Sequence, residues 1–271
     1  MDTPFQIVVC AGLVPDPLQT LEPAAGPAGP VLKNEMMLPL VIDPWAAHAL
    51  FEAAALAKRF PGSKVWLVSL APRAKLQQVM MTVAQKAAFE LVALDSPAGG
   101  FTESAEIAAE IAAAIERLPG IDKSRLLVFG GWESASRGTG TTLQTVGERL
   151  GIFEQFQGVD RLDMAPDGAF QVIERIEGGR HQASACSGLP AVFGWATGEL
   201  PEPPNNPQIG MANMRTVMPA LNRARPVKIA NEGLSFARVT APNQRRDTKI
   251  IKDMAPGQIA REIVDWIGPE Q

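Results

Sequence analysis

Apolar runs alternate with longer amphipathic segments over most of residues 1–196. Short apolar runs rich in β-branched residues are typical of buried parallel strands, and the segments between them have the length and spacing of helices. Strands separated by helices predict βαβ units, and therefore a Rossmann-like α/β fold with a parallel sheet and flanking helices. The strands are expected at 7–11, 65–70, 89–94, 126–131 and 191–195, and the helices at 44–59, 74–86, 104–117 and 141–150.

Two stretches depart from this alternation. Residues 14–30 contain five prolines, which exclude a helix, so a loop is expected there. After Gly151 polar and apolar residues nearly alternate at 158–162, 170–176 and 182–186, with the turn Glu-Gly-Gly-Arg at 177–180 between the last two. This pattern predicts an antiparallel hairpin at the edge of the sheet.

From Thr197 onward the periodicity is weak, and proline and asparagine are frequent. One terminal helix is expected, at 256–267. A segment of this length with so little apolar periodicity makes a poor independent domain. We therefore expect an α/β domain at 1–196 and, at 197–271, an extended segment that wraps another protein.

Composition excludes several kinds of site. A net charge of −4 without a basic cluster argues against nucleic-acid binding. Cys10 and Cys186 stand too far apart for a CxxC motif, and with only His48 and His181 a histidine-based metal cluster or catalytic relay is not expected. His48 lies in a helix-like run, where a surface position is favoured over catalysis. Without an apolar run of eighteen residues or a secretory signal, the sequence predicts a soluble, cytoplasmic protein.

The glycine- and threonine-rich stretch at 130–142 joins an expected strand to an expected helix. Its glycines permit positive φ, and the helix start offers N–H groups and the positive end of a dipole, so it can cradle a phosphate. It has neither the Walker A form nor G-x-G-x-x-G, and a tight turn with a capped helix is the alternative. Ligands bind at the carboxyl ends of parallel strands, so the loops after Cys10, Leu70 and Phe129 are the places to inspect.

Seven short motifs occur in the same order as in the β subunits of electron-transfer flavoproteins, and together they span nearly the whole chain. Val-Ser-Leu-Ala-Pro at 68–72 resembles the family's Val-Ser-x-Gly-Pro, and Leu-Pro-Ala-Val at 189–192 matches its Leu-Pro-Ala-Val. The other five are Ile-Val-Val-Cys at 7–10 with Val-Pro-Asp-Pro at 14–17, the helix that opens with Asp-Pro-Trp at 43–45, the glycine loop at 131–140, Glu-Arg-Ile-Glu-Gly-Gly at 174–179, and Met-Pro-Ala-Leu-Asn-Arg-Ala-Arg at 218–225.

The resemblance implies an electron-carrier subunit rather than an enzyme, paired with an α subunit that carries FAD. That flavin accepts electrons from acyl-CoA or amine-type dehydrogenases and passes them to a quinone oxidoreductase. The β subunit usually holds a structural AMP, and bifurcating relatives hold a second FAD there. By position, the resemblance implies nucleotide contacts from Cys10, Asp43, Leu70, Gly131, Ser136, Gly138, Thr139, Gly140, Thr141 and Thr142.

The resemblance also implies two sets of contacts to other proteins. Pro17 and Trp45 fall where β-subunit residues lie near the flavin of the α subunit. Leu-Pro-Glu-Pro at 200–203 resembles the Leu-Asn-Glu-Pro of the loop that docks into partner dehydrogenases. Leu200 is then the anchor of that loop, with Glu202 beside it.

The glycine loop departs from the family pattern. Ser136 and Gly138 replace two acidic residues, and Trp-Glu at 132–133 replaces Lys-Gln. These changes preserve a phosphate cradle but leave open whether the bound nucleotide is AMP or FAD.

Two other hypotheses use the same loop. An ATP-hydrolysing or adenylating protein would need a cationic clamp, for which only Arg137 is placed. A nucleotide-sensing stress-type protein would be compact, which the long C-terminal segment argues against.

Overall fold

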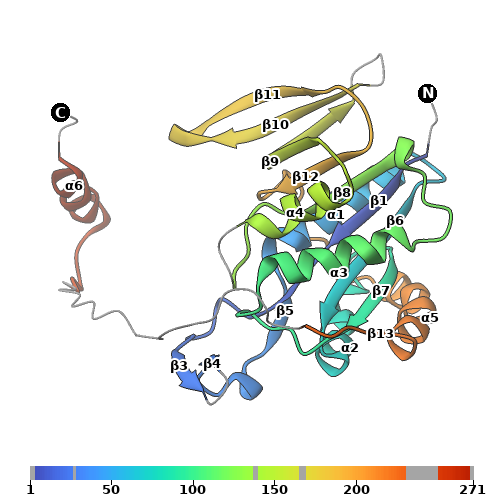
Figure 1. Cartoon of the computed structure of the whole chain (residues 1–271). Coiled ribbons are helices and arrows are strands. Elements are labelled where there is room, and N and C mark those ends of the chain that lie inside the picture. The colour runs from blue at the N-terminus through green and yellow to red at the C-terminus, as the bar shows by residue number, and fades with distance from the viewer. Residues whose placement is uncertain (1–3, 27–28, 137–139, 165–168, 230–249, 269–271) are drawn as a thin grey trace. The chain divides into compact units, whose positions relative to one another are not determined.

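The structure is a computed structural model that describes residues 4–26, 29–136, 140–164, 169–229 and 250–268. The chain divides into two compact units, Met1–Val239 and Thr240–Gln271, and each is described by itself. Figure 1 shows the first unit as a central sheet with helices packed against it.

The main sheet has nine strands in the order β11-β10-β9-β12-β8-β1-β6-β7-β13. From β9 through β12 to β13 every neighbouring pair is parallel, which confirms the predicted Rossmann-like core. After β1, the strands β6 and β7 lie on one side of it, and the later strands β8 and β12 lie on the other side. The strand order therefore reverses between β1 and β8. The strands of this part are β1 (Gln6–Cys10), β6 (Lys64–Ala71), β7 (Glu90–Asp95), β8 (Leu126–Gly131), β12 (Ala191–Trp195) and β13 (Arg225–Pro226).

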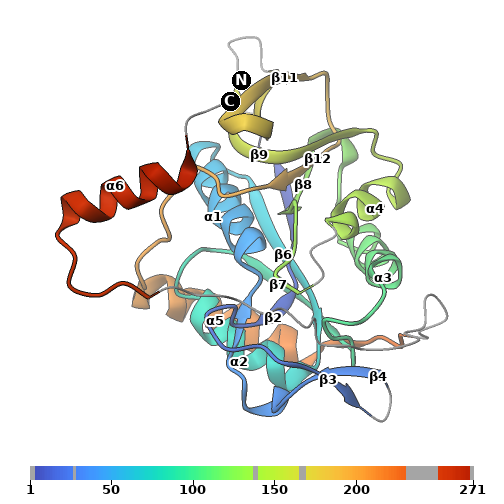
Figure 2. The ribbon, with the colours of Figure 1, turned by 90° about the vertical axis from the view of Figure 1, so that its left-hand side faces the viewer.

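Helices cover both faces of the sheet (Figure 2). Ile7 and Val9 of β1 face one core with α1, α2 and α5, whereas Val8 and Cys10 face another with α3 and α4. This alternation follows from the two-residue period of a strand, with both faces buried. The helices are α1 (Pro44–Arg59), α2 (Arg73–Val83), α3 (Ser104–Glu116), α4 (Thr141–Arg149) and α5 (Pro207–Asn222).

An antiparallel extension completes one side of the sheet, as the near-alternating pattern predicted. Strand β9 (Glu154–Met164) pairs with β12 and with β10 (Phe170–Ile176), and β10 pairs with the edge strand β11 (Arg180–Cys186). The turn between β10 and β11 contains the short 3-10 helix η3 (Glu177–Gly179).

The proline-rich stretch is not a helix, but it is more ordered than the expected loop. Strand β2 (Leu13–Pro15) pairs with β5 (Leu40–Ile42), and β3 (Pro23–Gly26) pairs with β4 (Gly29–Leu32). Each of these small sheets has only two strands, so prolines can occupy positions whose N–H would have no partner. Two short 3-10 helices, η1 (Glu35–Met37) and η2 (Lys123–Arg125), precede β5 and β8.

The expectation of a single helix after Thr197 was wrong, because α5 was missed. Asn206 caps it by accepting hydrogen bonds from the N–H groups of Gln208 and Ile209, and Pro207 occupies its first position. Val217 and Leu221 are fully buried in the core beneath it. Residues 207–222 therefore belong to the α/β unit.

The second unit contains the helix predicted at its end, α6 (Pro256–Ile267). Its apolar side chains are exposed, among them Ile259, Ile263 and Trp266. Within the described part of the chain, no helix combines the length and the apolar character that a membrane crossing requires.

Candidate functional site

A cavity of about 90 Å³ lies at the carboxyl edge of the sheet, beside the ends of β1 and β8. In open α/β sheets the reversal of strand order leaves a crevice at this edge, and ligands bind there. Six of the residues implied by the resemblance line the cavity, although they come from five separate stretches of chain. They are Cys10, Asp43, Leu70, Gly131, Gly140 and Thr142.

The first turn of α4 forms one wall of the cavity. Gly140 precedes the helix with φ 63° and ψ 10°, and it has no side chain with which to cap the helix. A Cβ atom at Gly140 would overlap the carbonyl oxygen of Trp132, so both the backbone angle and the space require glycine. The positive end of the helix dipole, next to Thr142, makes this wall the place where an anionic group would bind.

Asp43 joins α1 to the loop after β8. It is buried, and one carboxylate oxygen accepts a hydrogen bond from the N–H of Trp45 at 3.3 Å. The other oxygen accepts from the hydroxyl of Ser134 at 2.7 Å and from the N–H of Ala135 at 3.1 Å. Asp43 therefore shapes the cavity chiefly by fixing this loop.

Gly131 allows α1 to approach the end of β8. A Cβ atom there would lie 2.7 Å from Cβ of Trp45 and 2.8 Å from the carbonyl oxygen of Glu133. Both distances are shorter than van der Waals contact, so any larger residue would push Trp45 away from the end of β8.

Two other predicted contact residues that the structure describes, Ser136 and Thr141, do not line the cavity. The hydroxyl groups of Ser136 and Ser134 lie 3.0 Å apart, which stabilises the loop. The Thr141 hydroxyl lies 3.0 Å from that of Ser104, so it joins the starts of α4 and α3. Gly138, Thr139 and the clamp candidate Arg137 lie outside the described residues.

The thiol at the cavity is not an activated nucleophile. Burial raises the pKa of the Cys10 thiol to about 12, so this thiol stays protonated and is not a nucleophile. Neither histidine lines the cavity, and no cluster of three His, Cys, Asp or Glu side chains suited to a metal ion occurs in the ranges that the structure covers.

The positions implied to face partner proteins lie on the surface. Pro17 is exposed in the loop after β2, and Trp45 is half-buried in the first turn of α1. Leu200 is 37% exposed, and Glu202 forms an ion pair of 2.8 Å with Lys86.

The family model for the electron transfer flavoprotein domain matches residues 35–225. The matched region runs from η1 to β13 and includes most of the cavity wall. This chain belongs to the electron transfer flavoprotein domain family. A comparison with curated proteins finds no match. Membership indicates an electron-transfer role of the flavoprotein type, since members are generally electron carriers rather than enzymes.

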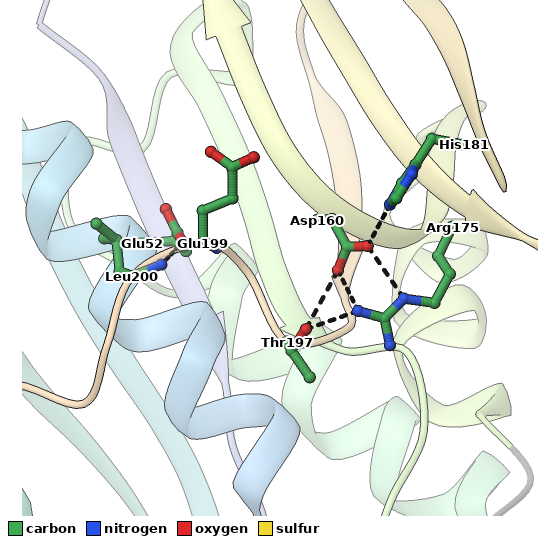
Figure 3. A network of polar contacts seen from close by, with 7 residues as sticks. All are labelled: Glu52, Asp160, Arg175, His181, Thr197, Glu199 and Leu200. Atoms are coloured by element: carbon green, nitrogen blue, oxygen red, sulfur yellow. Dashed lines mark hydrogen bonds and ion pairs between the residues drawn. The ribbon is translucent and has the colours of Figure 1, made fainter. Parts of the chain in front are cut away.

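In this member of the electron transfer flavoprotein domain family, the structure also shows a polar network that sequence reasoning missed (Figure 3). The buried carboxylate of Asp160, on β9, accepts hydrogen bonds from Arg175 on β10 and lies 2.9 Å from Nε2 of His181 on β11. Arg175 also donates to the hydroxyl of Thr197 at 2.7 Å. Burial alone would raise the pKa of Asp160, but the hydrogen bonds from Arg175 and His181 outweigh it and lower that pKa. The only sequence signal was the Glu-Arg pair at 174–175.

Proposed function

We propose that this chain is the β-type subunit of an electron-transfer flavoprotein and works as a heterodimer with an α subunit that carries FAD. The flavin of that subunit would accept electrons from acyl-CoA or amine-type dehydrogenases and pass them to a quinone oxidoreductase. The observation that carries the proposal is the cavity between β1 and β8, which offers a helix N-terminus and close glycine packing.

In this proposal the cavity binds AMP as a structural ligand. Its residues fit part of such a ligand, because the α4 N-terminus offers N–H groups for a phosphate and Leu70, Ile107 and Leu143 offer apolar surface. The volume of about 90 Å³ is below the ~300–1,000 Å³ of pockets that enclose a whole small molecule, so the rest of the nucleotide would lie across the mouth. AMP is the smaller of the two nucleotides and would leave less of itself outside this cavity than a second FAD would, so the proposal takes AMP as the ligand.

The proposal assigns each surface a role. Trp45 and Pro17 would lie near the flavin of the α subunit, and Leu200 with Glu202 would meet the donor dehydrogenase. Within residues 197–271, the segment before α5 would supply the docking loop, and the part that follows β13 would supply the arm that wraps the α subunit. The protein partners are therefore expected at the surface, while the nucleotide site stabilises the fold.

A nucleotide count on the purified heterodimer tests the proposal. The chain is co-expressed with an α subunit, the complex is denatured, and the released FAD and AMP are separated and counted per heterodimer. One FAD and one AMP are expected. Two FAD molecules would identify the bifurcating type, whereas a stable flavin-free homodimer that binds ATP would overturn the proposal.

A further inference from the structure

The segment 197–203, here called the docking segment, joins β12 to α5 without forming a helix or strand. It is nevertheless held at several points. Thr197 accepts a hydrogen bond from Arg175, and the ammonium group of Lys86 donates to the carbonyl oxygen of Pro203 at 3.0 Å. Between these points lies Leu200, the residue proposed to meet the dehydrogenase.

Glu52 of α1 contacts the middle of this segment (Figure 3). Its oxygen Oε1 accepts hydrogen bonds from the N–H groups of Glu199 at 3.2 Å and of Leu200 at 3.3 Å. Because the segment has no regular structure, this carboxylate replaces the backbone acceptors that a helix or strand would supply. One side chain therefore fixes two successive peptide groups of the segment.

Gly198 lets the backbone pass closely over Glu52. It has φ 63°, and a Cβ atom there would lie 2.5 Å from Oε1 of Glu52. A larger residue would be strained by its backbone angle and would displace the carboxylate. The glycine and the glutamate thus form one unit, although 146 positions separate them in the sequence (198 minus 52).

Leu200 is 37% exposed, and it lines a surface cavity of about 140 Å³ together with Phe129, Leu162 and Trp195. Holding an apolar anchor in place before binding lowers the conformational entropy lost on association.

We propose that Glu52 is the positioning residue of the docking segment, and that its acceptor oxygen sets the conformation in which Leu200 is presented to the partner protein. The role assigned to Leu200 rests on the proposed function. The positioning by Glu52 rests only on contacts within this chain, so it can be tested without a partner.

Residue-resolved amide hydrogen exchange on the full chain tests this positioning. In Glu52→Ala the protection of the Glu199 and Leu200 amides should fall about tenfold or more, as expected when a hydrogen bond to a charged acceptor is removed. Glu52→Gln keeps an oxygen acceptor of the same reach and should restore most of this protection. Gly198→Ala should displace the Glu52 carboxylate and thereby lower the protection of the same two amides.

Matched controls separate positioning from general destabilisation. Glu116→Ala removes an exposed carboxylate from α3, on the opposite face of the sheet, and Gly188→Ala adds a methyl group where nothing lies within 4 Å. Both should leave the two amides unchanged. Unchanged exchange of Glu199 and Leu200 in Glu52→Ala would overturn the proposal, as would faster exchange spread over α1 and the sheet or a failure of Glu52→Gln to restore protection.

Discussion

Asp160 and Arg175 form a bidentate ion pair across neighbouring strands, with Nε 3.0 Å from Oδ2 and Nη2 2.8 Å from Oδ1. Asp160 is buried on β9, and Arg175 reaches from it to the hydroxyl of Thr197. Through this pair the antiparallel extension of the sheet is joined to the start of the docking segment. Two parallel hydrogen bonds hold the Arg175 guanidinium in one orientation, and its third hydrogen bond then fixes the position of Thr197 relative to β9.

Asp160→Asn should therefore lower the free energy of unfolding, by about 1–3 kcal/mol near neutral pH, because hydrogen bonds to a buried charged group are lost. The lowered pKa of Asp160 means that its contribution is present above the ordinary value of 3.8 and is lost as the pH falls through the folded-state pKa. Urea unfolding from pH 7 to pH 3 checks this. A difference between variant and wild type that stays constant down to the acid end would contradict it.

The second prediction concerns α5. Leu221→Ala should lower the free energy of unfolding by about 2–5 kcal/mol, because Leu221 is fully buried. Met211→Ala on the same helix should change it by no more than about 0.5 kcal/mol, since Met211 is 66% exposed. Equal effects in urea unfolding would show that α5 is not part of the cooperative α/β unit.

Helix α5 shows why part of the fold could not be predicted from the sequence. Strands β1, β6, β7, β8 and β12 could be predicted because each is a mainly apolar run in the interior of the sheet. Helix α5 has only a narrow row of buried positions, and glycine and proline interrupt its sequence. The buried positions are Gly210, Asn213, Val217 and Leu221. The amide of Asn213 donates to the carbonyl oxygens of Ala84 and Ala87, a tertiary contact that hydropathy cannot indicate.

The residues of the candidate site were likewise only partly predictable from the sequence. Residues at strand ends and helix starts could be predicted, because parallel strands bring those positions to one edge: Cys10, Gly131 and Gly140 meet there. Thr141 instead contacts Ser104, and the contact of Glu52 with the docking segment has no local signature. Such pairings depend on side-chain directions in the folded chain, which spacing along the sequence does not give.

The third prediction tests the α4 wall of the cavity. In the co-expressed heterodimer, Gly140→Ala should release AMP while FAD stays at one per heterodimer, because the added methyl group would overlap the Trp132 carbonyl oxygen and displace the helix start. Gly188→Ala is the matched control and should keep both nucleotides. If Gly140→Ala retains a full complement of AMP, the nucleotide does not depend on this wall.

The fourth prediction concerns Cys10. Since its thiol is buried and its pKa is raised to about 12, it should react with iodoacetamide only when the protein unfolds. In the unfolded chain the thiol has a pKa near 9.0, so above this pH the unfolded state loses its proton before the folded state does. The free energy of unfolding should therefore fall as the pH rises from about 9.0 toward the folded-state pKa. Mass spectrometry of the labelled protein, with Cys10→Ala to identify the site, gives the readout. Rapid labelling of Cys10 in the folded protein would show an accessible thiol at the cavity.

The last prediction separates docking from folding at Leu200. In a heterodimer with the FAD-carrying subunit, Leu200→Ala should slow reduction of the flavin by a purified acyl-CoA dehydrogenase about tenfold or more, since a central apolar anchor often contributes 2 kcal/mol or more to binding. Its unfolding free energy should fall by less than that of Leu221→Ala, because 37% of Leu200 is already exposed. Ile176→Ala removes an apolar side chain of similar exposure, 41%, from β10 and should leave the reduction rate unchanged. Equal rates in all three proteins would place the dehydrogenase contact elsewhere on the subunit, whereas a loss shared by both variants would point to the antiparallel edge as part of the same surface.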